Sequence, residues 1–529
     1  MDKKSGGYFF QRNGLFIALG IIFFSLLISI AGREIYMRLS YELHEVYTAD
    51  NSLYFAVGKG MLHGYAPYRD LYENKPPMVF LLSAISYALT GNFYLVNIIC
   101  FVNIIILIVL PLVFLWKNKT DSSLLTTLLL AFAILTISLL LALYGEARSG
   151  EGQVELYGAT CLVIYFFLAL STKKEAKFYH PMIVFSGIFL GIAVMFKEPF
   201  AIIALVGALL LFNDKKTFLK RVIWPGIYGI VTALVILLVS RSLPYYFTIY
   251  LKTMFSNYVD GGESFAVAAF NVKRIIADLG SYSLLLPALI ALVYFYNIAR
   301  VIINLIKKPN LPTVINLLGL FLLPFIASYS VSIGGHLYNH HFVTPLPLYA
   351  LIILYSLTFK TFPYVAKSMT ASELQFEGLF SLLLVSLGIS SFAGNSVFNY
   401  YQATIENTII MKQKARYLDE VLDSLNVDRF LYIGFNGFTP YAYSTHDPLG
   451  PSFAQDPNNF KGEENYFVTG FFDALFETEV IVYSRNTLGV YYAEAMNYIY
   501  ANFTTSSPSE ILLLDRPSSF NETLFFRQI

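Results

Sequence analysis

Long apolar stretches separated by short polar segments dominate the pattern of hydrophobic and polar positions along this chain. A run of about 20 apolar residues is long enough to cross the hydrocarbon core of a bilayer as a helix. Eleven runs of roughly this length are present, at 15–31, 95–116, 123–143, 156–170, 181–196, 199–212, 222–240, 281–300, 313–331, 342–358 and 378–394. The pattern therefore predicts a polytopic α-helical membrane protein with about 11 transmembrane helices, the first of which is a retained span and not a cleaved signal.

Clusters of lysine and arginine predict how these helices are oriented, because such clusters are enriched in cytoplasmic loops. They occur at 117–121, 171–177, 213–221, 304–310 and 359–367. The N-terminus is then cytoplasmic, and the loops outside the cytoplasm are 32–94, 144–155, 241–280 and 332–341. The loop 241–280 contains four basic residues and departs mildly from this rule.

One apolar segment, MVFLLSAISYALT at 78–90, is too short to span the membrane. If it did span, it would invert every later helix relative to the basic clusters. We therefore expect it to lie in the outer leaflet, at the end of the first outside loop.

The pattern changes after residue 394. An amphipathic stretch at 403–424 predicts a helix, and short apolar runs at 429–434, 479–484 and 510–515 predict strands, with another helix near 488–502. These elements predict a small C-terminal α/β domain outside the cytoplasm at 395–529, following a transmembrane domain at 1–394.

The predicted topology has a direct test. A reporter that is active only in the cytoplasm, fused after Gly394, should be silent, because the basic clusters place this position outside. A fusion after residue 308, within a predicted cytoplasmic loop, should be active and serves as the control. Activity of the Gly394 fusion would contradict the assigned orientation.

Composition agrees with a membrane protein, with 56% hydrophobic and 13% charged residues and a mean hydropathy of +0.59. The net charge of +1 gives no reason to expect nucleic acid as a partner. Both cysteines, Cys100 and Cys161, lie inside apolar runs, so no disulfide framework is predicted.

The first outside loop concentrates polar residues in HEVYTADNSLYFAVGKGMLHGYAPYRDLYENKPP, residues 44–77. Asp50 precedes an amphipathic run and can be the N-cap of an interfacial helix. A carboxylate there can also meet a lipid head group. Lys75 can be an anchor that extends its amine toward the membrane surface, or it can pair with a phosphate as a compact charge.

The segment ADNSLYFAVGKGMLHGYAPYRDLYENKPPMVFLL resembles the first outside loop of the type C glycosyltransferases, in particular the branch of protein O-mannosyltransferases and lipid A aminoarabinose transferases. The shared features are an Asp that begins a helix, a G..PY.D turn and a KPP triplet before an apolar segment. GEGQVELYG, MFKEP and HLYNHHFVTPLP follow in the order and topology of that family. Asn51 departs from its pattern, since an acidic residue is common at that position, and Asn74 stands before Lys75 where some relatives have an acidic or other polar residue.

The resemblance implies an enzyme, a hexosyl- or pentosyltransferase. It would move a sugar from a polyprenyl-phosphate donor to a hydroxyl acceptor on a glycan, lipid or protein, with inversion, at the outer side of the cytoplasmic membrane. Asp50 would be the general base, and Lys75 would neutralise the leaving phosphate. Arg69, Lys197 and His341 are further candidates for binding the donor phosphate.

Several of these positions keep alternative interpretations. Glu155 can bind a divalent cation or the acceptor, or can be a structural acid at the interface. Lys197 can reach phosphate or only the membrane surface. The histidines at 336, 340 and 341 can bind a metal, donate to phosphate or pack; of these, His340 joins Glu155 as a candidate for acceptor or metal. The sequence thus leaves a divalent cation as the candidate cofactor.

Three other classes of protein compete with a glycosyltransferase. A polymerase of envelope polysaccharide also combines many spans with polar outside loops. A transporter of lipid or oligosaccharide is expected to place charges near the bilayer midplane, whereas here they gather at one face. A non-catalytic scaffold would not need an ordered set of acid, base and prolines.

Overall fold

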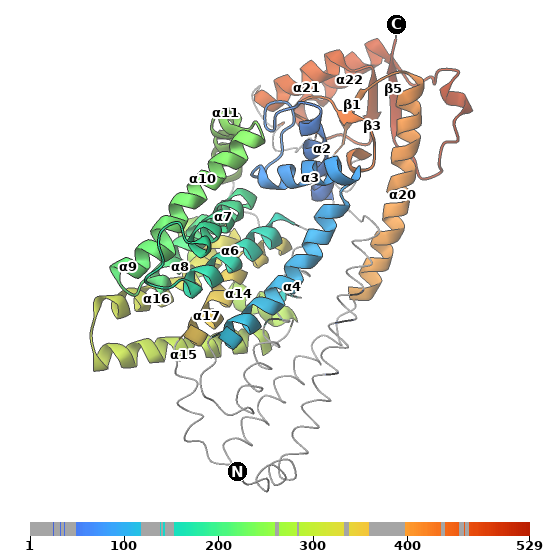
Figure 1. Ribbon diagram of the computed structural model, residues 1–529. Helices are drawn as coiled ribbons and strands as arrows, with labels where there is room; N and C mark the ends of the chain where they lie inside the picture. Colours follow the sequence, from blue (N-terminus) through green and yellow to red (C-terminus); the bar gives the residue numbers. More distant parts are fainter. Residues whose placement is uncertain are drawn as a thin grey trace.

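The computed structural model describes residues 25, 32, 36, 49–117, 138, 141–142, 153–259, 264–282, 285–332, 338–358, 397–434, 440–453, 460 and 465–528 of the 529-residue chain. A bundle of apolar helices occupies one end of this part, and a small sheet with its helices occupies the other (Figure 1). The helices α2 (Ala49–Leu62) and α3 (Met78–Thr90) lie between them.

Five helical stretches in the described residues are long and apolar enough to cross a membrane: Tyr94–Pro111, Val154–Ser171, Lys215–Val239, Leu286–Lys307 and Leu311–Ser332. A helix of 22 residues is about 33 Å long, close to the ~30 Å hydrocarbon thickness of a bilayer. The predicted runs at 15–31, 123–143 and 378–394 lie outside the described residues apart from isolated positions. The total of about 11 spans therefore stays a prediction.

The apolar helices of the bundle follow the predicted runs closely. They are α4 (Tyr94–Lys117), α6 (Val154–Ser171), α7 (Pro181–Phe196), α8 (Pro199–Leu211), α10 (Trp224–Val239), α15 (Leu285–Lys307), α16 (Leu311–Ser332) and α17 (Leu346–Thr358). The short α9 (Lys215–Phe218) and the π-helical η1 (Leu219–Ile223) lead into α10.

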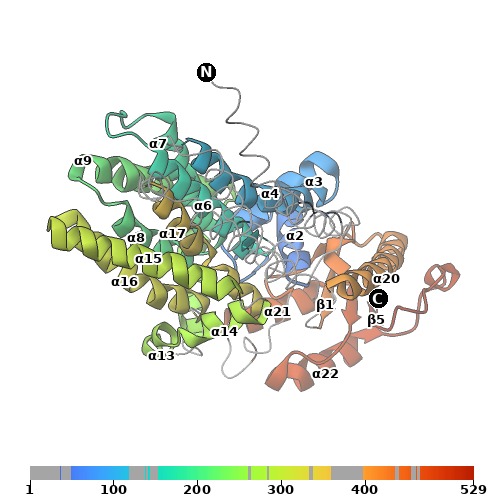
Figure 2. The same cartoon turned by 90° about the horizontal axis from the view of Figure 1, so that it is seen from below.

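Helix α6 is central in this bundle, since it packs against α4, α7, α8 and α17 (Figure 2). It is buried over most of its length, whereas α10 and α15 leave large apolar side chains such as Ile230 and Ile306 exposed. Exposed apolar side chains are expected where a helix faces lipid.

The remaining helical segments of the bundle are short. They are α11 (Leu243–Tyr245), η2 (Tyr246–Tyr250), α12 (Leu251–Thr253), η3 (Met254–Val259), α13 (Phe265–Phe270), α14 (Lys273–Tyr282) and the 3₁₀ turn η4 (Asn339–Val343). They fall in the predicted outside loops 241–280 and 332–341, except that α14 and η4 each extend two residues beyond these bounds.

The apolar segment at 78–90 forms the helix α3, which begins directly after Pro76 and Pro77 and packs against α2. Proline is well tolerated at a helix start, because its missing N–H would be unpaired there anyway. The placement of α3 in the outer leaflet stays a prediction.

The C-terminal part contains α20 (Val397–Ser424) and a five-stranded sheet in the order β2-β1-β3-β5-β4. Its strands are β1 (Arg429–Ile433), β2 (Asp447–Pro448), β3 (Val480–Tyr483), β4 (Phe503–Thr504) and β5 (Thr523–Arg527). β1 pairs in parallel with β2 and β3, and β5 pairs antiparallel with β3 and β4. The other helical elements are η5 (Pro440–Ala442), α21 (Tyr466–Glu477), η7 (Gly489–Tyr491), α22 (Tyr492–Asn502) and η8 (Ile511–Leu513).

Most predicted elements of this part are confirmed: the helix at 403–424, the strands at 429–434 and 479–484, and the helix near 488–502. The predicted strand at 510–515 is wrong. The segment forms the 3₁₀ turn η8, in which Leu512 and Leu513 are 73% and 88% exposed. A short apolar run alone does not show whether its side chains are buried, and the sheet instead uses β5 as the antiparallel partner of β3.

The C-terminal part holds α2 through a buried charge. The Lys59 Nζ, whose residue is 1% exposed, donates to the carbonyl oxygens of Ser444 and His446 at 2.9 and 2.5 Å. It also lies 3.4 Å from Asp447 Oδ1, and His63 Nδ1 contacts the other oxygen of that carboxylate. The predicted domain boundary at 394/395 lies outside the described residues and stays a prediction.

Candidate active site

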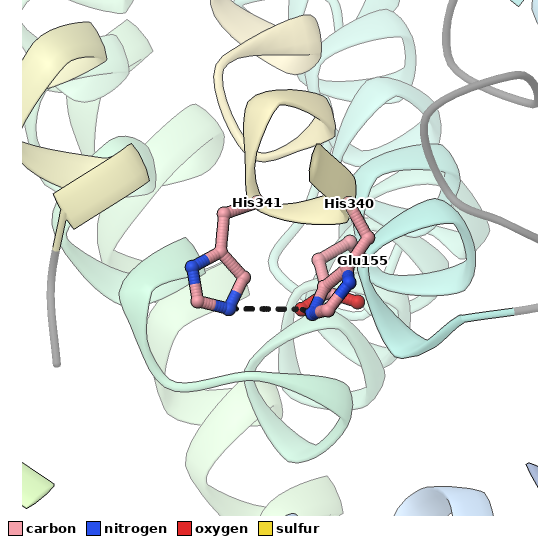
Figure 3. A group of neighbouring side chains, drawn as sticks. All are labelled: Glu155, His340 and His341. Atoms are coloured by element: carbon pink, nitrogen blue, oxygen red, sulfur yellow. Dashed lines mark ion pairs between the residues drawn. The ribbon is translucent and has the colours of Figure 1, made fainter. Parts of the chain in front are cut away.

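Charged and imidazole side chains from separate parts of the chain meet at the start of α6. Glu155, in the first turn of this helix, is fully buried. One of its carboxylate oxygens, Oε1, forms an ion pair with the Nζ of Lys197, which lies between α7 and α8. The Nε2 atoms of His340 and His341, on η4, lie 3.8 and 4.0 Å from the same oxygen (Figure 3).

A close approach of two helices brings Glu155 and Lys197 together. Gly158 lies one turn after Glu155 on α6, and Phe200 lies in the first turn of α8, three residues after Lys197. A Cβ at Gly158 would overlap the Phe200 ring, so only glycine allows this contact. The ion pair is therefore set by backbone packing as well as by charge.

Asp50 reaches the same region from the first turn of α2. Its Oδ2 accepts a hydrogen bond from Gln153 Nε2 at 2.9 Å, and Gln153 Oε1 accepts one from the Tyr54 hydroxyl at 3.2 Å. Gln153 directly precedes α6, so the starts of α2 and α6 are joined. The helix begins at Ala49, which places Asp50 inside its first turn and not before it as predicted.

Lys75 approaches from the loop before α3, with its Nζ 6.0 Å from the centre of the Tyr54 ring. Its positive charge is close enough to lower the pKa of His340 and of His341, and the Asp50 carboxylate raises the pKa of His340. Asp50 and Lys75 are thus neighbours of the Glu155 cluster, which comprises Glu155, Lys197, His340 and His341.

The surroundings of the two histidines of the Glu155 cluster favour the neutral form of the imidazole. Burial is the largest cause, and it lowers the pKa of His340 and holds that of His341 well below the usual value. The Lys197 ammonium lowers both further, while the Glu155 carboxylate opposes the shift. Neutral imidazoles can donate one hydrogen bond each or ligate a metal.

Glu155, His340 and His341 can also hold a metal ion, since their ligand atoms all lie within 4.8 Å of one another. The second carboxylate oxygen, Glu155 Oε2, is buried and has no hydrogen-bond partner among the described residues. Two imidazoles and a carboxylate form a donor set that suits Zn²⁺. The three residues therefore fit a divalent cation.

Arg69 is the one predicted phosphate-binding residue that lies apart from this cluster. It forms hydrogen bonds of 2.7 and 2.6 Å with both carboxylate oxygens of Asp70, and it donates to the Tyr245 hydroxyl. It lines an open cleft of about 330 Å³ together with residues of α21 such as Tyr466, whose hydroxyl donates to the Arg69 carbonyl oxygen at 2.5 Å. His336, from the predicted histidine group, lies outside the described residues.

Other residues of this region were not predicted from the sequence. Gln153 stands in GEGQVELYG, where its polar amide just before an apolar run was the available signal. Glu198 follows Lys197, and its Oε1 accepts hydrogen bonds from the hydroxyls of Tyr246 and Tyr250 at 3.2 and 2.7 Å. No local pattern predicts a contact between residues about fifty positions apart.

No family model matches the chain, and no curated protein sequence matches it. Among solved structures, the oligosaccharyltransferase of Archaeoglobus fulgidus in the apo form is similar over 87% of this chain and 69% of its own, with 12% identity and a TM-score of 0.47. AglB from Archaeoglobus fulgidus, an oligosaccharyltransferase in complex with an inhibitory peptide and a dolichol-phosphate, has 13% identity and a TM-score of 0.48 over the same shares.

ArnT from Cupriavidus metallidurans, bound to undecaprenyl phosphate, is similar over 98% of both chains, with 12% identity and a TM-score of 0.47. These neighbours are of the kind that the sequence resemblance names.

Proposed function

We propose that this chain is an inverting glycosyltransferase that moves a sugar from a polyprenyl-phosphate donor to a hydroxyl acceptor at the outer face of the cytoplasmic membrane. The observation that supports this most directly is the meeting of a general-base candidate with two lysines and two neutral imidazoles in one place. The residues concerned are Asp50, Lys75, Glu155, Lys197, His340 and His341.

The transfer needs a base on one side of the sugar and a positive charge on the other. The acceptor oxygen forms a bond to the anomeric carbon, the bond from that carbon to the donor phosphate oxygen breaks, and the polyprenyl phosphate leaves. Asp50 takes the proton of the attacking hydroxyl, and Gln153 holds its carboxylate in place through the 2.9 Å hydrogen bond.

Negative charge grows on the departing phosphate during this step. Lys75 lies near this region and offers a compact positive charge, which counts most if it acts on the charge that develops in the transition state. Lys197 already forms an ion pair with Glu155. It therefore acts on the phosphate as part of this ion pair and not as an isolated cation. His340 and His341 can each donate an N–H to the phosphate.

A position at the membrane surface suits a donor with a lipid tail. Because the sugar arrives already activated on its carrier, no nucleotide-binding loop is required, and the chain contains no GxxxxGK[ST] pattern. The N-terminus is cytoplasmic in this proposal, and the acceptor is a glycan, lipid or protein presented outside.

A divalent cation bound by Glu155, His340 and His341 would supply a Lewis acid and a further positive charge beside the phosphate. Zn²⁺ added after chelation should therefore raise the melting temperature of the purified protein, since a ligand that binds only the folded state stabilises it. Thermal unfolding in detergent measures this shift.

The H340A/H341A variant should lose the zinc-induced shift, while H180A, which changes a histidine outside the cluster, should keep it. If the wild-type melting temperature does not respond to Zn²⁺, or if H340A/H341A responds equally, these residues do not form the metal site.

The experiment that tests the proposed function directly is a screen of polyprenyl-phosphate-linked sugars with the purified protein in membranes. Release of free polyprenyl phosphate that depends on one of these donors would establish both the reaction class and the sugar. Movement of an intact lipid-linked sugar across the membrane, with no release, would favour a transporter.

A further inference from the structure

A group of tyrosines joins the turn before Lys75 to the residue that follows Lys197. Tyr68 is completely buried and has φ of 71°, a conformation that is strained for a bulky residue. Strain of this kind persists only where the surroundings over-determine the backbone, and it often marks functional sites.

Tyr68 holds the Lys75 backbone directly. Its hydroxyl donates to the Lys75 carbonyl oxygen at 2.7 Å, and its backbone N–H donates to Leu71 O at 2.8 Å. The turn 68–75 is therefore closed by two hydrogen bonds of this one residue. The direction in which Lys75 leaves the turn depends on where the Tyr68 ring lies.

The Tyr68 ring is placed in turn by η2. Its centre lies 4.8 Å from that of Tyr250 and 6.2 Å from that of Tyr246, and these two rings stack on each other at 5.0 Å. The hydroxyls of both residues donate hydrogen bonds to the same oxygen, Glu198 Oε1. Hydrogen bonds to a carboxylate are among the stronger ones in proteins, so Glu198 fixes the two rings against Tyr68.

From this chain of contacts we infer that Glu198, acting through Tyr246 and Tyr250, positions Lys75 for the phosphate of the donor. Glu198 is a positioning residue in this inference, because it acts on Lys75 through the two tyrosines that it holds. Its neighbour Lys197 belongs to the Glu155 cluster, so one short turn between α7 and α8 supports the phosphate site from two sides. The inference rests on the proposed role of Lys75.

The inference predicts a specific loss of affinity. The Y246F/Y250F variant keeps both rings but removes both hydrogen bonds to Glu198. It should bind undecaprenyl phosphate about 2- to 30-fold more weakly, which is the usual size of coupling through packed side chains. Binding is measured on the full-length protein in lipid nanodiscs by titration with undecaprenyl phosphate.

Y165F is the matched control. The Tyr165 hydroxyl is also buried and donates to a carbonyl oxygen, that of Arg221 at 3.2 Å, but it lies on the second half of α6. We expect its affinity to equal that of the wild type. Should Y246F/Y250F fail to fold, Y250F alone removes the shorter of the two hydrogen bonds and is measured in the same way.

A purely structural role and a role through Lys75 differ in a double-mutant cycle. If the tyrosines act by positioning Lys75, Y246F/Y250F should cost little or nothing in the K75A background, because the group that they position is gone. An equal loss in both backgrounds, or no loss in either, would overturn the inference and leave the proposed function standing. Unchanged affinity of K75A itself would contradict the phosphate site and the inference together.

Discussion

Replacing Asp50 with asparagine should slow sugar transfer at least about 10²-fold, because general-base catalysis typically contributes 10²–10⁴ in rate. Asparagine has nearly the same shape as aspartate, and its side-chain oxygen can still accept the hydrogen bond from Gln153 Nε2. The variant should therefore fold, insert into the membrane and bind the lipid donor normally. Single-turnover measurements with a saturating donor separate the chemical step from binding.

Asp70 provides the comparison for this test, since it belongs to the same outside loop but pairs with Arg69 and with the backbone of Ala66. D70N should transfer sugar at a rate near that of the wild type. A D50N variant that turns over normally would return Asp50 to the role of a helix-terminal acid, and Glu45, Asp70 or Glu155 would become the candidate base.

The candidate site could be predicted in part because membrane topology constrains where polar residues end up. Asp50, Lys75, Glu155 and Lys197 each stand at the end of an apolar run or in an outside loop, and the basic clusters assign those ends to one face. Polar residues that lie on one face of a bundle share a limited area, so they are expected to lie near one another. Their direct contacts still depend on helix packing, as at Gly158 and Phe200.

The residues that escaped prediction share a different property, since their partners are distant in the sequence and their neighbours are ordinary. Glu198 looks like a helix-start acid, and Tyr246 and Tyr250 look like interfacial aromatics. Arg69 was predicted from its charge and yet lies apart from the Glu155 cluster, because its Nε and Nη2 atoms donate to the adjacent carboxylate of Asp70 and its Nη1 atom donates to the Tyr245 hydroxyl. The charge of a residue alone therefore does not identify which basic side chain belongs to the candidate site.

The fold shows the same division between local and long-range information. Helices such as α6 and α16 could be predicted directly from apolar runs, since a long run of apolar residues is enough to indicate a buried or lipid-facing helix. The sheet was harder to predict from the sequence, because its strands are two to five residues long and its pairing joins segments far apart in sequence. The run at 510–515 has strand-like composition and yet lies exposed as η8, while the real partner of β3 is β5.

Removing the Lys75 ammonium in K75A should weaken binding of undecaprenyl phosphate about 10- to 100-fold, the range expected for loss of a hydrogen bond to a charged group. Turnover of the sugar donor should fall with it, because the departing phosphate loses a neutralising charge. Lys75 is partly buried and its backbone is held by Tyr68, so truncation of the side chain leaves the turn in place. Titration in nanodiscs and initial rates at several donor concentrations measure the two effects.

K75R should recover only part of the affinity, because the guanidinium is planar, larger and differently hydrated, whereas the site accommodates a compact charge beside Tyr54. K174A is the matched control for net charge. Lys174 pairs with Asp214 at 3.2 Å and follows the opposite end of α6, roughly 24 Å of helix away from Glu155. If K174A weakens binding as much as K75A does, the effect reflects the overall charge of the protein, and Lys75 has no specific contact with the phosphate.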